Sequence, residues 1–342
     1  MVEHRFWQEG RVIRPFCRAA RVRCRGYSQP VQRRLTDFGA ELAVGQVPAK
    51  LQEHYGIEVP VSAVRTLTEA QARPIHVQEP GPPPLPAQGV AWGIAETDGS
   101  MSPIVDTAAP QTTAAGRDRR KTRQVRWQEA RLSLAHAHGS VTPRFAATCG
   151  APDAVGEQLR DCARRVGFGP TSRVHSVGDG APWIANQVPR VFGQQGTYLV
   201  DFYHLSEYLA AAAPRCAPQT PVQWLAQQQA QLKQGDVVGV QAGLVPYLEA
   251  TEVPDTVAPV RCCYRYLANR PGQFDYQRAL AAALPIGSGE IESAHRYVIQ
   301  QRLKLAGAWW KEETAADMLA LRTLRANGEW NQYWATLEQP PA

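Results

Sequence analysis

The sequence lacks paired cysteines, long apolar runs and a strong excess of charge of one sign. Its 342 residues include seven cysteines, none in a Cys-x-x-Cys pair, so neither a zinc site nor a disulfide framework is indicated. No apolar run approaches the ~18 residues that a membrane helix needs. Charged residues from position 3 onward do not fit a signal peptide. We therefore expect a cytoplasmic protein with free thiols and no membrane partner.

Basic residues are distributed unevenly, although the net charge is only +6. Residues 1–34 contain nine arginines and two acidic residues, and a second basic cluster lies within 117–126. Blocks of arginine attract phosphate backbones, while a solvated, flexible arm would give the same pattern. The residues of these blocks that we expect to contact DNA are Arg21, Arg23, Arg25, Arg33, Arg34, Arg119, Arg120 and Lys121.

The segment after the first basic block predicts three short helices. We place them at 36–43, 47–55 and 63–72, the last with Ser62 as its N-cap. A helix, a glycine-containing turn and a capped helix are typical of a helix-turn-helix, although any small helical bundle has the same pattern. Residues 1–73 are therefore predicted to form a basic arm and a helical DNA-binding region.

Six prolines in residues 74–88 predict a stiff linker and a domain boundary. Beyond it, the expected elements are strands at 89–97, 125–136, 141–149, 173–177 and 197–200, and helices at 153–166 and 183–191. Three strands, a helix, a strand, a helix and a strand indicate a mixed α/β domain. The order matches a ribonuclease-H-like core, in which acids at strand ends converge on one edge of the sheet.

The rest of the chain is predicted to be helical. Polar, Ala- and Gln-rich sequence from about 205 to 284 predicts an all-helical insertion, and a further helix is expected over 290–305. We therefore expect one catalytic domain at 89–335 and a tail at 336–342.

Acidic residues recur in four distinctive motifs. These are Glu96-Thr97-Asp98-Gly99, Gly178-Asp179-Gly180-Ala181, Asp201-Phe202-Tyr203-His204 and Gly287-Ser288-Gly289-Glu290-Ile291-Glu292-Ser293. Magnesium prefers hard oxygen ligands. Two ions about 4 Å apart activate an attacking oxygen and stabilise a leaving one. The series therefore indicates an enzyme that cuts and rejoins nucleic-acid backbones.

Each acid also has a structural interpretation. Asp98 and Asp179 follow expected strands, and either could simply begin a turn. Glu96 is a candidate auxiliary ligand on the strand face of Asp98. Glu290 and Glu292 compete for one role, since they lie about 200° apart around a helix and both cannot face one metal pair.

Other residues of these motifs leave alternatives open. Asp201 and His204 could form a hydrogen-bonded pair, a metal-linked pair or an N-cap. Arg296 lies on the helix face of Glu292, where it could contact phosphate or form an ordinary ion pair. Trp309 could stack on a DNA base or pack in the core.

The motifs together resemble the bacterial insertion-sequence transposases of the DDE class, and the Kra-type group most of all. The resemblance covers roughly residues 90–335. It rests on the second, third and fourth motifs in order, on Arg302-Leu303-Lys304, on Gly307-Ala308-Trp309-Trp310 and on Asn327-Gly328-Glu329-Trp330. The front of the chain departs from the family, whose N-terminal region is usually longer and often has paired cysteines. This departure affects end recognition more than the fold.

The resemblance implies a catalytic and metal-binding triad of Asp98, Asp179 and Glu292, with Mg²⁺ or Mn²⁺ as cofactor. Asp201 and His204 match an auxiliary D-x-x-H signature. Arg296, Arg302, Lys304 and Trp309 join the expected DNA contacts. The implied activity is cleavage of transposon ends followed by strand transfer to target DNA, in a nucleoid-associated homodimer or larger assembly. Two alternatives remain: a non-catalytic DNA-binding copy, and a ribonuclease-H-like nuclease that does not join strands.

Overall fold

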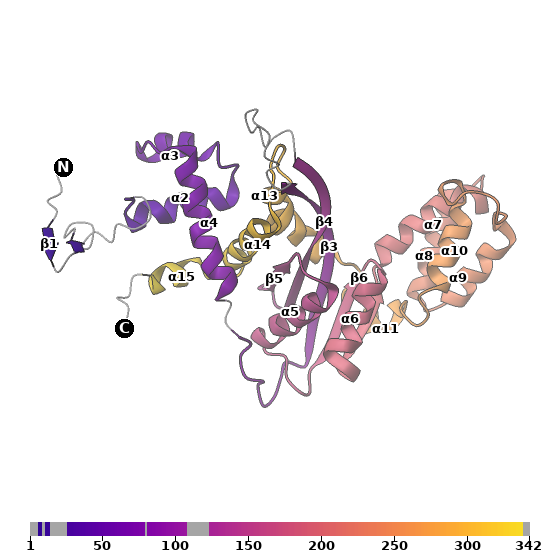
Figure 1. Cartoon of the computed structure of the whole chain (residues 1–342). Helices are drawn as coiled ribbons and strands as arrows, with labels where there is room; N and C mark the ends of the chain where they lie inside the picture. The colour runs from indigo at the N-terminus through magenta and orange to yellow at the C-terminus, as the bar shows by residue number, and fades with distance from the viewer. Residues whose placement is uncertain (1–5, 9–10, 14–25, 79–80, 108–122, 338–342) are drawn as a thin grey trace.

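A computed structural model describes residues 6–8, 11–13, 26–78, 81–107 and 123–337 of the chain. It is a mixed α/β structure with a five-stranded sheet at its centre (Figure 1). In the described part of the chain, no helix is both long and apolar enough to cross a membrane.

The central sheet has the order β5-β4-β3-β6-β7, with antiparallel pairing from β5 to β3 and parallel pairing from β3 to β7. Its strands are β3 (Trp92–Thr107), β4 (Arg123–Ala137), β5 (Arg144–Thr148), β6 (Arg173–Gly178) and β7 (Gly196–Val200). A separate antiparallel pair is formed by β1 (Phe6–Gln8) and β2 (Arg11–Ile13). The mixed α/β class predicted from the sequence is confirmed.

Alternate residues of β3 face different helical layers, as the period of two in a strand requires. Ala95 packs with Leu159 of α5 (Pro152–Arg165) in one cluster. Ile104 packs with Leu319 of α14 (Glu312–Ala326) in another. Helix α6 (Pro182–Phe192) lies beside α5, followed by the short η1 (Gly193–Gln195). The sheet is therefore covered on both faces, and the even-numbered side chains of β3 face the C-terminal helices.

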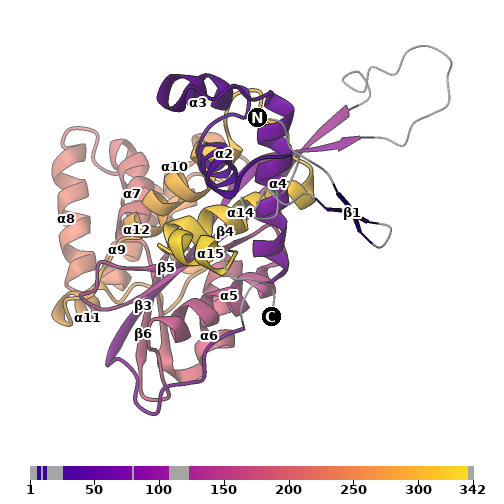
Figure 2. The same cartoon turned by 90° about the vertical axis from the view of Figure 1, so that its left-hand side faces the viewer.

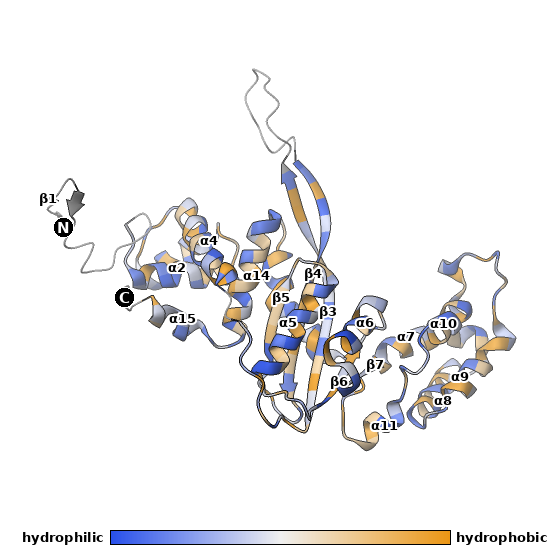
Figure 3. Ribbon diagram, turned by 60° about the horizontal axis from the view of Figure 1, so that its bottom comes forward, coloured by the Kyte–Doolittle hydropathy of each residue, from blue (hydrophilic) through white to orange (hydrophobic). Residues whose placement is uncertain are grey.

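The strands β3 and β4 continue past the sheet as a two-stranded ribbon (Figure 3). One ribbon face is buried: the Val105 N–H donates to Trp310 O at 2.7 Å, and Ile104 is fully buried. On the ribbon, Met101 and Trp127 remain 46% and 61% exposed. We expected the first strand to end at Asp98, and this is wrong, because β4 pairs with β3 along its whole length and places Asp98 opposite Leu132.

Three N-terminal helices form a unit with its own apolar core: α2 (Gln29–Glu41), α3 (Val47–Tyr55) and α4 (Val61–Val77). This unit packs on α14 through α4 and α2 (Figure 2). The bounds of the second predicted helix are confirmed. The first helix begins seven residues earlier than expected, since Ser28 and Pro30 set its start, and Thr36 lies inside it. The third has Pro60, not Ser62, at its N-cap position.

The expected linker begins inside a helix. Pro74 lies within α4, which runs to Val77, whereas residues 81–88 of the proline-rich segment form no helix or strand. A proline lacks only its own N–H, so a helix that is well packed on one side can tolerate it near its C-terminal end. Ala72 and Ile75 of this helix contact the α14 cluster, which provides that packing.

The segment after β7 is helical throughout, as predicted for the insertion. It contains α7 (Phe202–Cys216), α8 (Pro221–Lys233), α9 (Val237–Leu244), η2 (Val245–Tyr247), η3 (Asp255–Val257), α10 (Pro259–Ala268) and α11 (Tyr276–Ala281). These helices project from the β7 side of the sheet, opposite the N-terminal unit (Figure 1). Their core is continuous with Val177 and Val200 of the sheet.

The last helical region carries the fourth acidic motif. It begins as α12 (Gly289–Ala294), becomes the π-helical η4 (His295–Gln300) and ends with α13 (Gln301–Leu303), ahead of α14 and α15 (Trp330–Thr336). The expected helix is present, but its middle is wider than an α-helix. The Gln301 N–H bonds to Arg296 O, five residues back. Such π-helical turns occur frequently at functional sites.

Candidate functional site

Three aspartates lie level with one another across the parallel strands. Ile94 pairs with His175, so continuing that register by four residues places Asp98 beside Asp179. Gly178 pairs with Val200, so one further step places Asp179 beside Asp201. The Asp201 N–H confirms the alignment by donating to Gly178 O at 2.7 Å. Parallel pairing thus brings three distant motifs to one edge of the sheet.

Asp98 lies on the even-numbered face of β3, beneath the C-terminal helices. Its Oδ1 accepts the Gly99 N–H at 2.7 Å, and its Oδ2 lies 3.6 Å from Nε2 of His295 in η4. The pKa of Asp98 is raised to about 6. Burial is the main cause, the Gly99 hydrogen bond opposes it, and the nearby carboxylates of Asp179 and Glu292 add to it. Asp98 therefore lies within electrostatic range of Asp179 and Glu292.

The turn that carries Asp179 is fixed from two sides. Asp179 Oδ1 accepts the Ala181 N–H at 2.8 Å, while the Tyr198 hydroxyl accepts the Gly180 N–H at 3.0 Å. From α10, the Tyr266 hydroxyl donates to Asp179 O at 2.7 Å and Arg270 Nε donates to Gly180 O at 2.8 Å. The helical insertion thus determines where the Asp179 carboxylate lies.

Asp201 connects the third motif to the fourth. It is the N-cap of α7, where Oδ1 accepts the backbone N–H groups of Tyr203 and His204. Its Oδ2 accepts from the backbone N–H and the hydroxyl of Ser288, at 2.5 and 2.6 Å. The Ser288 Oγ also lies 3.2 Å from Oε1 of Glu292. Of the alternatives open for Asp201, the N-cap is the one observed, and Ser288 links it to Glu292.

His204 is directed away from the carboxylate of Asp201. Its ring packs edge-on against Tyr208, and Nδ1 is 3.9 Å from the Glu207 carboxylate. A side-chain hydrogen bond between Asp201 and His204 is absent from the described contacts, where only the His204 backbone N–H reaches Asp201. His204 is 39% exposed in its side chain and remains accessible to a ligand.

The two glutamates of α12 have different partners. Glu290 pairs with His136 of β4, Oε2 to Nε2 at 2.9 Å, and this hydrogen bond raises the pKa of His136. Glu292 contacts Ser288 and influences Asp98. This division favours Glu292 as the third acid of the site. Glu96 of β3 is 1% exposed, and its Oε2 accepts the N–H of Ile291 in α12 at 3.2 Å. Burial raises the pKa of Glu96 well above its usual range.

Within the described residues, no group of three or more His, Cys, Asp or Glu side chains is arranged tightly enough to hold a metal ion as it stands. The three carboxylates are hard oxygen donors, which suits magnesium or manganese, and their number suits an ion that keeps water or phosphate ligands. The donor chemistry therefore fits the expected cofactor, while a finished coordination shell is not formed by these side chains.

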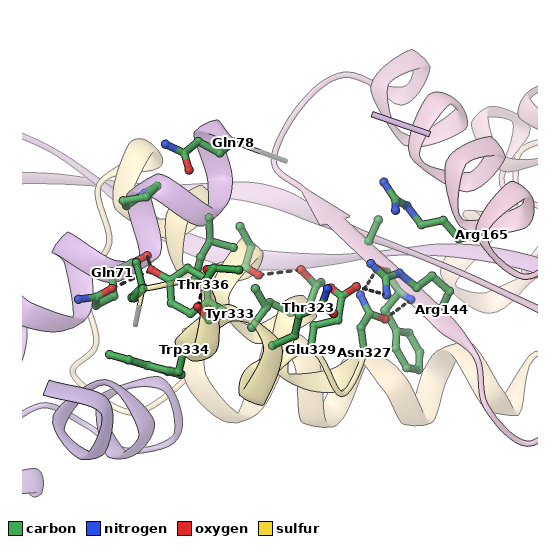
Figure 4. Close-up of a pocket in the computed structure, with 18 of the residues that line it drawn as sticks. Gln71, Gln78, Arg144, Arg165, Thr323, Asn327, Glu329, Tyr333, Trp334 and Thr336 are labelled. Atoms are coloured by element: carbon green, nitrogen blue, oxygen red, sulfur yellow. Dashed lines mark hydrogen bonds and ion pairs between the residues drawn. The ribbon is translucent and has the colours of Figure 1, made fainter. Parts of the chain in front are cut away.

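A cavity of the described structure lies elsewhere, between the N-terminal unit and the sheet edge. It has a volume of about 610 Å³ and is lined by Gln71 of α4, Arg144 of β5 and Tyr333 of α15 (Figure 4). Asn327 reaches this edge and forms two hydrogen bonds with the backbone of Phe145. Its Oδ1 accepts the Phe145 N–H, and its Nδ2 donates to Phe145 O. None of the predicted acids lines the cavity. Carboxylate chemistry therefore identifies the site better than cavity size does.

The expected DNA contacts divide into three groups. Arg21, Arg23, Arg25, Arg119, Arg120 and Lys121 lie outside the described residues. Arg296 and Lys304 are exposed beside the site, and Trp309 is 50% exposed with the Arg123 guanidinium 3.1 Å from its ring centre. Arg33 and Arg34 are half-buried on α2.

Arg302 is a correction to the predicted contacts. Its side chain is buried, 4% exposed, with Nε donating to Gly39 O at 3.0 Å and its guanidinium over the ring of Trp310. The residue joins the N-terminal unit to the C-terminal helices and is not available to DNA. We therefore remove it from the expected contacts.

Sequence reasoning missed the residues that support the acids. Ser288 lies inside a quoted motif, and its spacing of four from Glu292 could have indicated the contact. Tyr266 and Arg270 carry no local signal, because they belong to the insertion and meet Asp179 only in the fold. His295 lies three residues after Glu292, which places it on the same helix face, but its approach to Asp98 depends on β3.

The fold and these residues define a mixed α/β protein with a carboxylate-rich site at one sheet edge. Residues 164–337, which are 174 of the 342, match the model of an uncharacterised protein family, UPF0236. The chain belongs to this family. No curated protein matches it. The matched segment contains Asp179, Asp201 and Glu292 and begins after Asp98.

Proposed function

We propose that the chain is a DNA transposase of an insertion sequence, with a ribonuclease-H-like catalytic core. The observation that carries this proposal is that acids from three distant segments meet at one sheet edge. The strand register places Asp98 and Asp179 level with Asp201, and the Ser288 hydroxyl joins Asp201 to Glu292. Their order along the chain, with a helical insertion before the last acid, is that of the DDE transposases. The sheet order, three antiparallel strands followed by two parallel ones, supports the ribonuclease-H-like assignment.

In this proposal Asp98, Asp179 and Glu292 hold two Mg²⁺ or Mn²⁺ ions. Such ions, when bound, activate an attacking oxygen and stabilise the leaving one in phosphoryl transfer. The protein's part is to orient the carboxylates. Tyr266 and Arg270 fix the turn of Asp179, and Ser288 directs Glu292 from the Asp201 side. The His295 ring shields Asp98 from solvent on its helical side.

DNA is the proposed partner on the exposed side of this edge. Arg296, Lys304 and Trp309 follow Glu292 along the chain, are exposed, and offer charge and a stacking surface for a strand near the acids. Cleavage would release a 3′-hydroxyl, and strand transfer would exchange one phosphodiester for another, so no nucleotide triphosphate is needed. Two transposon ends require at least two copies of the chain, acting in the bacterial cytoplasm.

The test is magnesium-dependent cleavage and joining on labelled DNA from the two ends of the element that contains the gene. We expect wild type to produce nicked and joined products. Asp179→Asn and Glu292→Gln should abolish both with DNA binding unchanged. Glu290→Gln is the matched control, because Glu290 lies two residues before Glu292 on the same helix. It should remain active because Glu290 pairs with His136.

Three results would change the assignment. Cleavage without joining would indicate a nuclease. DNA binding without cleavage in any version would indicate a non-catalytic copy. Activity that survives Glu292→Gln and is lost in Glu290→Gln would show that the third acid is Glu290.

A further inference from the structure

One buried arginine touches both the N-terminal unit and the π-helical segment beside the acids. Arg322 of α14 is 5% exposed. Its Nε donates to Val298 O at 2.6 Å, its Nη1 donates to Ala40 O at 2.6 Å, and its Nη2 donates to Tyr297 O. A single planar guanidinium, with its donors in a fixed fork, therefore joins the C-terminal end of α2 to η4.

The π-helical geometry explains why η4 needs this partner. In an α-helix the Gln301 N–H would bond to Tyr297 O, four residues back. Here it bonds to Arg296 O instead. The carbonyl of Tyr297 thereby loses its ordinary helical donor, and Arg322 provides a charged one. Hydrogen bonds from charged donors are stronger than neutral ones, so this contact favours the π-helical turn over a regular helix.

The other end of the contact is the last turn of α2. Ala40 O accepts from Arg322, and Gly39 O accepts from the equally buried Arg302 of α13. The nearest carboxylate is Glu41, 3.2 Å from Nη1 of Arg322 and 42% exposed. Carbonyls at a helix C-terminus carry partial negative charge, so two cations there are favourable. The N-terminal unit is thus attached by the same group that holds η4.

η4 is continuous with the helix that carries the third acid. It starts at His295, whose ring lies 3.6 Å from the Asp98 carboxylate, and it directly follows α12, which contains Glu292. Any change in the path of η4 moves both residues relative to β3.

We infer that Arg322 is a positioning residue, which sets the place of Glu292 and His295 against Asp98 only while the N-terminal helical unit is seated on α14. The expected effect on DNA cleavage rests on the proposed function. The expected effect on the path of η4 does not. An N-terminal unit that engages DNA would in this way be connected to the acids through one side chain.

The experiment compares Arg322→Gln and Arg322→Lys with the matched control Arg325→Gln. Arg325 lies one turn away on α14 and also contacts α2, through Asp37 and Glu41, but it has no contact with η4 among the described interactions. Hydrogen exchange of the amides of residues 295–303 reports the path of η4 without any DNA. The cleavage rate at saturating DNA and the DNA affinity are measured separately, together with thermal stability.

We expect exchange at 295–303 to rise about tenfold in Arg322→Gln, the factor that loss of one charged hydrogen bond gives. The rate at saturating DNA should fall by about the same factor or more, with affinity within about twofold. Arg322→Lys keeps the charge but not the fork, so it should fold and lie in between. Arg325→Gln should leave both quantities at the wild-type values.

Unchanged exchange at 295–303 in a folded Arg322 variant would overturn the inference. So would an equal increase in Arg325→Gln, because it would mean that any weakening of the α2 contact suffices. If Arg322→Gln does not fold, Arg322→Lys decides by the same criteria. If wild type has no cleavage activity, the proposed function fails, while the exchange comparison still tests the positioning role.

Discussion

Nε2 of His295 lies 3.6 Å from Oδ2 of Asp98, yet the two residues do not form an ion pair at neutral pH. Burial lowers the pKa of His295 to about 4, so its ring is neutral. An imidazolium would stabilise the Asp98 carboxylate, whereas a neutral ring mainly removes water from it. Burial is the main cause of the raised pKa of Asp98, about 6, and the His295 ring is one of the groups that cover this carboxylate.

Stability should depend on pH through Asp98. The folded protein binds this proton more tightly than the unfolded chain, where the pKa is near 3.8, so the stabilisation from Asp98 is full below that value and is lost as pH rises through about 6. Asp98→Asn should therefore match wild type near pH ~4 and be more stable near pH ~8, by on the order of 2 kcal/mol. Thermal unfolding at both pH values measures this. Equal differences at the two pH values would contradict it.

Divalent cations should stabilise the wild type through the same carboxylates. At a concentration 100 times the dissociation constant, a bound ion adds about 2.7 kcal/mol. Thermal unfolding with and without Mg²⁺ or Mn²⁺ should show an increase in wild type that is absent from Asp98→Asn and Asp179→Asn.

Glu96→Gln is the control for that measurement, two residues along the same strand face. Glu96 is buried, and burial raises its pKa well above the usual range. The amide oxygen of glutamine can still accept the Ile291 N–H. We expect this variant to keep the cation response. A loss of the response in Glu96→Gln would make Glu96 a ligand in its own right.

Ser288→Ala should impair the site more than the fold. The substitution removes the hydroxyl that contacts both Asp201 and Glu292 but keeps the Ser288 backbone N–H bond to Asp201. The stability loss should be about 1–2 kcal/mol, typical of one hydrogen bond to a charged group. Cleavage should fall about tenfold or more, because Glu292 loses its orienting contact. Ser293→Ala, on an exposed neighbouring position, is the comparison and should change neither quantity.

The two adjacent tryptophans should behave differently when truncated. Trp310 is 7% exposed and its Nε1 donates to Leu303 O, so Trp310→Ala should cost about 3–5 kcal/mol of stability. Trp309 is 50% exposed, so Trp309→Ala should change stability by less than about 0.5 kcal/mol. If Trp309 stacks on a base, its loss should weaken DNA binding about tenfold. Unfolding curves and binding titrations separate the two effects. Unchanged DNA affinity in Trp309→Ala would exclude the stacking role.

Much of the sheet was predictable because its strands and helices alternate in a clear pattern. The expected strand at 173–177 ends one residue before β6, and the expected helix at 183–191 is one residue shorter than α6 at each end. Asp98-Gly99 has the composition of a turn, but pairing with Leu132 and Arg131 of β4 continues the strand through it. Long-range pairing overrides a local turn signal when a complete partner strand is present.

The details of the site were less predictable, because they depend on contacts between distant segments. The motifs predicted the acids, but the approach of His295 in η4 to the Asp98 carboxylate depends on the fold. The π-helical turn itself has no sequence signal, since the apolar positions there also fit an ordinary helix. Arg302 belongs to a motif that indicated DNA contact, and only its contact with α2 shows that its side chain is buried.

The hydrogen bond from Tyr266 to Asp179 O spans 87 residues of chain. During synthesis, β6 and the turn after it leave the ribosome well before α10 exists, so the aspartate is made long before its support. Contacts of such sequence separation form late, because the intervening loop must close first. The acidic edge should therefore reach its final shape as one of the last events of folding, after the insertion has folded.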